Sequence, residues 1–152
     1  MTDLDYARSF FANDAYATKT SGIEIAEVGD GFSRVRLVTD ARHYNALGHV
    51  MGGVYTSMAD FAFAVAASYD RPPTVTVASS ASFLAGSDGG ELFAEARRIH
   101  EGGRTCVYEV RVTDDTGTLL VLVTVNGYKL RPKSAVSQEA AAAEPNPFRR
   151  YR

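Results

Sequence analysis

The chain has little cysteine, histidine and tryptophan, and these shortages exclude several classes of protein. Its 152 residues include one cysteine, Cys106, so no disulfide can form within the chain, as is usual for proteins of a reducing compartment. With three histidines and one cysteine, no group of residues has the spacing of a metal site. We therefore expect no metal ion and a cytoplasmic location.

The chain also lacks a strong excess of charge and an unbroken apolar run. A net charge of -2 disfavours a nucleic-acid partner, because such proteins usually have a basic face. The N-terminus lacks the basic segment and apolar core of a signal peptide. The most apolar stretch, residues 51–69, is interrupted by Gly, Thr, Ser and Asp, whereas a membrane span needs ~20 consecutive apolar residues. We expect neither a nucleic-acid nor a membrane partner.

The remaining composition is that of a soluble globular protein, with 45% hydrophobic and 22% charged residues. A chain of this length fits one domain that buries a substantial core. We assign residues 1–132 to that domain. Residues 133–152 are rich in Ala, Pro and charge, so we expect them to form a flexible C-terminal tail.

The spacing of apolar residues predicts two helices and six strands. The helices are expected at residues 4–17 and 51–69, and the strands at residues 23–28, 32–38, 74–84, 92–99, 105–113 and 118–130. Short turns between the last four strands predict an antiparallel meander. The predicted fold is α+β, with an antiparallel sheet wrapped around one long central helix and an additional N-terminal helix.

A motif precedes and enters the central helix. Asn45, Gly48, Gly52 and Gly53 are followed by Asp60, seven residues after the second glycine of the pair. In this combination the chain resembles the hotdog-fold acyl-CoA thioesterases of the PaaI-like (phenylacetic acid degradation) branch. The resemblance implies a hotdog fold and hydrolysis of an acyl-CoA thioester. It also implies that no metal or organic cofactor takes part, coenzyme A being part of the substrate.

Asp60 and Gly53 are the predicted centre of the chemistry. A carboxylate in an otherwise apolar helix needs a partner or a function. The resemblance gives Asp60 the role of nucleophile or of general base for water, and the residues leave both open. The first N–H groups of a helix lack partners and suit an oxyanion, so the Gly53 N–H is the expected donor. Tight helix-to-sheet packing would equally explain the glycine.

The spacing of these two residues predicts an assembly. Gly53 and Asp60 are ~10.5 Å apart along a helix axis. The attacking group and the oxyanion donor must lie within ~3 Å of one carbon. Two antiparallel helices related by a two-fold axis near Thr56 and Ser57 would bring Gly53 of one chain beside Asp60 of the other. The spacing therefore predicts a homodimer with shared active sites, which the family resemblance also implies. We further expect a homotetramer built as a dimer of dimers.

Other residues complete the predicted site. Asn45 would donate to the carbonyl or hold water, or else stabilise its own turn. Thr76 would hydrogen-bond Asp60 or the water, although its strand propensity also explains it. By resemblance, Arg104 lies in a turn near the coenzyme A phosphates. Gly52 and Met51 are expected to contact substrate. Aromatic residues are expected to line the acyl pocket, namely Tyr55, Phe61, Phe63 and Phe83.

Met51 departs from the family pattern, which has histidine before the glycine pair. A thioether accepts hydrogen bonds weakly and cannot transfer a proton. Either the histidine is dispensable, or His49 replaces it, or the chemistry is altered. The first hypothesis is a thioesterase for small or medium acyl groups, aromatic ones included. The alternative is a hotdog protein that binds acyl-CoA or another ligand without hydrolysing it.

Overall fold

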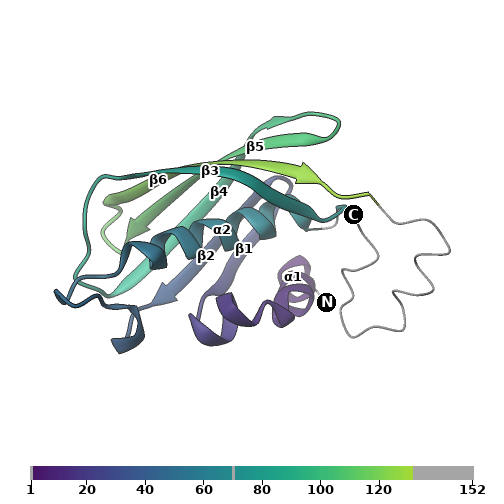
Figure 1. Ribbon diagram of the computed structural model, residues 1–152. Coiled ribbons are helices and arrows are strands. Elements are labelled where there is room, and N and C mark those ends of the chain that lie inside the picture. Colours follow the sequence, from purple (N-terminus) through teal and green to yellow (C-terminus); the bar gives the residue numbers. More distant parts are fainter. Residues whose placement is uncertain (1, 70, 132–152) are drawn as a thin grey trace.

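The computed structural model describes residues 2–69 and 71–131, which form a six-stranded antiparallel sheet curved around one helix (Figure 1). The helices are α1 (Asp3–Phe10) and α2 (Gly52–Ser68). The strands are β1 (Glu24–Gly29), β2 (Phe32–Val38), β3 (Thr74–Phe83), β4 (Glu91–Glu101), β5 (Thr105–Asp114) and β6 (Leu119–Lys129). The predicted fold class is confirmed. The predicted C-terminal tail lies outside the described residues.

The core lies between α2 and the concave face of the sheet. Alternate strand residues point inward, as the two-residue period of a strand requires, and they meet the apolar side of α2. Ser33 on β2 donates a hydrogen bond of 2.7 Å to the Ala62 carbonyl, which fixes the helix against the sheet. No helix in the described part of the chain is long and apolar enough to cross a membrane.

The N-terminal helix is shorter than predicted. The pattern predicted a helix over residues 4–17, but α1 ends at Phe10 and is followed by a 3₁₀ turn (Phe11–Asn13) and a π turn (Tyr16–Thr20). Asn and Asp, which favour caps and turns over helix interiors, occupy positions 13 and 14. The break lets the Phe11 ring pack edge-on against Phe61 of α2, with centroids 5.9 Å apart.

The predicted meander of four strands is wrong at its first member. The sheet order is β1-β2-β4-β5-β6-β3, so β4, β5 and β6 form a meander while β3 pairs with β6 at the edge. Strand β2 pairs directly with β4 over seven residues and closes the sheet beneath α2. Strand β3 is exposed along nearly its whole length, which suits an edge and not the centre of a sheet.

The two edges of the sheet differ. The β1 edge lies beside α1, whose Arg8 donates two hydrogen bonds, of 3.0 and 2.9 Å, to the Ile25 carbonyl. The β3 edge has no such cover among the described residues, and the side chain of Val77 there is 62% exposed. An open edge strand of ten residues is a surface on which another strand can pair.

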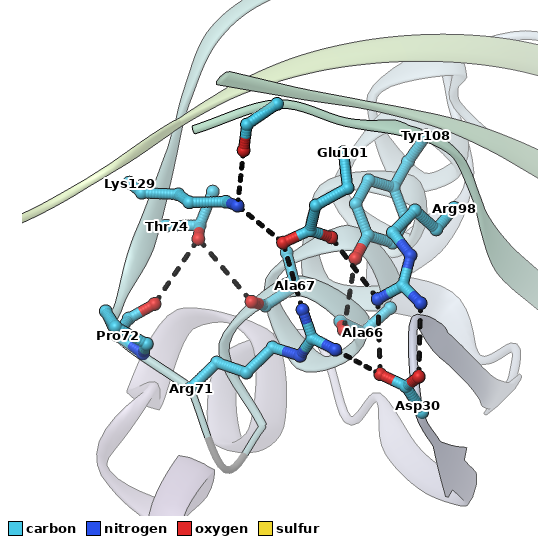
Figure 2. A network of polar contacts seen from close by, with 11 residues as sticks. Asp30, Ala66, Ala67, Arg71, Pro72, Thr74, Arg98, Glu101, Tyr108 and Lys129 are labelled. Atoms are coloured by element: carbon cyan, nitrogen blue, oxygen red, sulfur yellow. Dashed lines mark hydrogen bonds and ion pairs between the residues drawn. The ribbon is translucent and has the colours of Figure 1, made fainter. Parts of the chain in front are cut away.

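A network of ion pairs closes the end of the sheet near the C-terminus of α2 (Figure 2). Glu101 on β4 pairs with Arg71, Arg98 and Lys129, and Asp30 in the β1–β2 turn pairs with both arginines. The network thus connects the β1–β2 turn, the α2–β3 connection, β4 and β6. Beside it lies a cavity of about 150 Å³, whose lining includes the Cys106 thiol.

We predict that Glu101→Gln makes the protein less stable and less sensitive to acid. Burial raises the pKa of Glu101, but Lys129, Arg71 and Arg98 outweigh it, so the net pKa is lowered. A carboxyl with a lowered pKa stabilises the fold above its unfolded pKa, and this contribution is lost as pH falls through the folded value. Urea unfolding should show a loss of about 1 kcal/mol at pH 7 and a shallower decline of stability below about pH 5.

Glu27→Gln is the matched control, because Glu27 pairs with a single arginine among the described residues, Arg34 at 3.4 Å, and 55% of its side chain is exposed. Its effect should stay below about 0.5 kcal/mol. Equal losses in the free energy of unfolding would show that the Glu101 carboxylate contributes no more to stability than a carboxylate with one exposed partner.

Candidate active site

The start of α2 presents unpaired backbone N–H groups. The chain is extended at Met51, the N-cap residue, and its side chain makes no capping hydrogen bond. Within the described residues the N–H of Gly53 donates to no acceptor. Since the positive end of the helix dipole lies here, this N–H can bind a developing oxyanion.

Two apolar side chains lie over the glycine pair. A Cβ atom on Gly52 would lie 3.3 Å from a ring carbon of Phe83, and a Cβ on Gly53 would lie 3.1 Å from the Met51 methyl. Met51 and Phe83 are more than half exposed, at 54% and 57%. A side chain at either glycine would therefore press against Phe83 or Met51. These two exposed apolar side chains border the start of the helix.

Asp60 lies eight residues into α2 and is exposed. Its Oδ1 accepts a hydrogen bond of 2.9 Å from the Thr76 hydroxyl on β3, so the expected contact between these residues is present. Its Oδ2 has no hydrogen-bond partner among the described residues. Gly53, Thr56, Asp60 and Ala64 form a stripe of small and polar residues along this side of α2; Asp60 is exposed and the others are partly buried. The stripe ends at Ala67, which is only 4% exposed.

A second carboxylate near Asp60 escaped the sequence analysis. Asp14 follows the 3₁₀ turn after α1, and desolvation raises the pKa of its carboxyl, with the charge of Asp60 adding to the rise. A hydrogen bond from the Ala17 N–H opposes both effects. The sequence analysis predicted a continuous helix to residue 17, and nothing in such a helix indicates that Asp14 lies near Asp60. Asp14 was therefore missed.

Asn45 performs the turn role that was one of its two alternatives. Its Oδ1 accepts hydrogen bonds from the Leu47 N–H at 2.9 Å and the His49 N–H at 3.1 Å. The amide oxygen is thus engaged in the loop before the helix. A role for its NH₂ group toward substrate stays a prediction.

Arg104 lies far from the start of α2 within one chain. It is in the β4–β5 turn, over the Tyr128 ring, and its side chain donates to the Lys129 carbonyl. Lys129 pairs with Thr74, whose backbone N–H donates to Ser68 at the other end of α2. A single chain therefore does not bring Arg104 and Gly53 together.

Three of the four aromatic residues expected in the acyl pocket are in the core instead. Tyr55, Phe61 and Phe63 are at most 3% exposed. They lie on the side of α2 that packs on the sheet and the N-terminal segment, where for example Phe63 meets the Tyr108 ring. Only Phe83 lies at the glycine pair.

Comparisons with known proteins identify the family. Residues 47–121 match the family model of the thioesterase superfamily. The acyl-coenzyme A thioesterase PaaI of Escherichia coli is 34% identical over 109 residues, which are 71% of this chain and 77% of that protein. A 1,4-dihydroxy-2-naphthoyl-CoA hydrolase of Listeria monocytogenes is 33% identical over 107 residues, covering 68% of this chain and 87% of the relative.

A solved structure also resembles the fold. It is that of the E. coli PaaI protein from the phenylacetic acid degradation operon, which superposes with a TM-score of 0.79 and 28% identity. The match covers 85% of this chain and 94% of that chain. The curved sheet and the central helix thus belong to a fold that other proteins share.

Proposed function

This chain belongs to the thioesterase superfamily, in its hotdog-fold, PaaI-like branch, and is a thioester hydrolase; we propose that its substrates are small or medium acyl-CoA thioesters, aromatic ones included. The observation that carries the proposal is the pairing of two features on the open side of α2. In the first turn of the helix the Gly53 N–H has no acceptor among the described residues, and an exposed carboxylate, Asp60, lies farther along the same side. The first suits the carbonyl oxygen and the second suits the attacking group.

The proposed reaction places the thioester carbonyl oxygen on the Gly53 N–H. Asp60 of the partner subunit then either attacks the carbonyl carbon or takes the proton of an attacking water. Thr76 holds one oxygen of the carboxylate, which leaves the other oriented for the reaction. The steps use side chains, backbone, water and substrate, with no cofactor. A single turnover in ¹⁸O-water distinguishes the two routes, because only direct attack leaves the label in the Asp60 carboxylate.

The shared site requires a homodimer, and two surfaces support it. The open stripe of α2 carries Gly53, Thr56 and Asp60, whose small size allows a second helix to approach. The exposed edge of β3 runs beside it and can pair with the same strand of another copy. An antiparallel pairing would also bring Arg104 of the partner subunit toward the Gly53 end of the helix. Tetramers would form from two such dimers.

The experiment is a panel of aromatic and aliphatic acyl-CoA thioesters with thiol release as the readout. Saturable release of thiol supports the proposal, and the best acyl group identifies the preferred substrate. Binding without release would favour the alternative, a hotdog protein that holds acyl-CoA, which Met51 suggests because a thioether transfers no proton. Sedimentation of the same preparation tests the dimer.

We predict that Met51→His leaves kcat within about threefold of the wild type. Met51 packs its methyl against Gly53, so its contribution is apolar contact, and the proposed chemistry uses no proton at that position. Thiol release from the best acyl-CoA is the measurement, with Leu47→His, another exposed residue of the same loop, as the control for a new histidine. A gain of tenfold or more in Met51→His alone would show that the methionine limits activity.

A further inference from the structure

A histidine and an aspartate, 39 residues apart in sequence, form a pair beside the start of α2. The Nδ1 atom of His49 lies 2.7 Å from Oδ1 of Asp88. Both side chains are largely exposed, at 58% and 89%, so the attraction alone contributes little to stability. The pair determines which ring nitrogen faces Asp88. An ionised carboxylate only accepts hydrogen bonds, so Nδ1 must be the donor. The pair turns the second ring nitrogen, Nε2, away from the protein partner.

The backbone on both sides of the pair is anchored. The N–H of His49 donates to Asn45, and the N–H of Val50 donates to the Ser87 carbonyl at 3.0 Å. Ser87 in turn donates its own N–H to the Tyr55 hydroxyl on α2, at 3.1 Å. The two loops that carry His49 and Asp88 are thus tied to each other and to the first turn of the helix.

His49 lies two residues before Met51, the residue that covers the proposed oxyanion site. The Met51 methyl lies against Gly53, and the backbone is extended at Met51. Val50, between them, forms an isolated bridge with Tyr44 and is buried, at 5% exposure. The exposed His49 side chain is therefore at the start of α2, beside the residues on which the thioester would bind.

We propose that His49, held by Asp88, is the catalytic acid that protonates the departing thiolate, an inference that rests on the proposed thioesterase function. When the C–S bond breaks, its electron pair goes to sulfur and the Nε2–H of the imidazolium supplies the proton. The proton removed from the attacking water by way of Asp60 reaches solvent, and His49 is reprotonated from solvent. The sum is thioester plus water giving acid plus thiol. Asp88 accepts the hydrogen bond from Nδ1 and fixes the orientation of the ring.

The test varies the leaving group with the acyl group held constant. An alkyl thiolate such as that of coenzyme A is the more basic leaving group, so it gains more from protonation than the thiolate of a thiophenyl ester. His49→Gln should lower kcat/KM about 30-fold for the CoA thioester and less than about threefold for the thiophenyl thioester. Asp88→Asn should reproduce this selectivity with a smaller loss, about fivefold. His100→Gln, at an exposed histidine of β4, is the control and should change neither.

Three outcomes would overturn the inference. One is an equal loss on both thioesters, which means a structural role, and another is a raised KM with kcat unchanged, which means that His49 binds the coenzyme. The third is no loss at all. If His49→Gln fails to keep the melting temperature and assembly of the wild type, Asp88→Asn carries the test. A wild type that releases no thiol from any thioester refutes the proposed function itself, a result separate from these three.

Discussion

Asp60→Asn is expected to lower kcat about 1,000-fold. The amide has the size of the carboxylate, and its oxygen can still accept the Thr76 hydroxyl, which donates at 2.9 Å in the wild type. The neutral amide, however, neither takes a proton from water nor attacks a carbonyl carbon. The variant removes the chemistry while leaving the contact with β3, so its fold and assembly should be unchanged.

The measurement is thiol release with the best acyl-CoA, together with sedimentation of the variant. Asp115→Asn, at an exposed aspartate in the β5–β6 turn, is the matched control and should keep the wild-type rate. If Asp60→Asn retained more than a tenth of the wild-type kcat, Asp60 would be neither nucleophile nor base. A variant that is inactive and also dissociated would instead place Asp60 in the assembly.

Gly127→Ala is expected to destabilise the protein by about 2 kcal/mol, because β6 leaves no space for a methyl group at this position. A Cβ there would lie 2.6 Å from Cζ of Phe63, 2.8 Å from Sγ of Cys106 and 2.8 Å from Cγ2 of Thr74. These atoms belong to α2, β5 and β3, so no single movement relieves all three contacts. Alanine also lowers the conformational entropy of the unfolded chain, which offsets at most about 1 kcal/mol of this destabilisation.

For a protein of this length the loss corresponds to a fall in Tm of about 6 °C, which calorimetry or a thermal melt would detect. Gly103→Ala is the control, since a Cβ at Gly103 meets no atom within 4 Å and its φ is not in the left-handed region. Equal melting temperatures for the two variants would show that the packing around Gly127 yields to a methyl group.

Most elements were predictable because their side-chain periods are local. The alternation in residues 32–38 and 105–113 marks strands that appear as β2 and β5, and the apolar run after residue 51 becomes α2. The contact between Asp60 and Thr76 was one of the alternatives that the family resemblance suggested for Thr76. The predictions of the elements rest on chain neighbours.

The predictions that failed concern contacts that the local spacing of apolar residues does not determine. The edge position of β3 depends on which strand pairs with β6, and the turn that precedes β4 carries no information on that choice. A helix that is apolar on all sides does not show which way Phe61 and Phe63 point, so they were assigned to a pocket although they are buried. The pair of His49 and Asp88 joins two loops far apart in sequence, and only the folded backbone brings them together.

The unequal edges of the sheet determine how far self-association can go. A molecule with two open strands would add copies at both sides and grow into a ribbon. Here the Arg8 guanidinium on the β1 side already binds the Ile25 carbonyl, so within residues 2–69 and 71–131 the open edge is β3. Strand addition across a two-fold axis consumes that one site in both molecules, so growth by pairing stops at two copies. Arg8, on the opposite edge of the sheet from β3, would thereby keep that edge from adding a further copy.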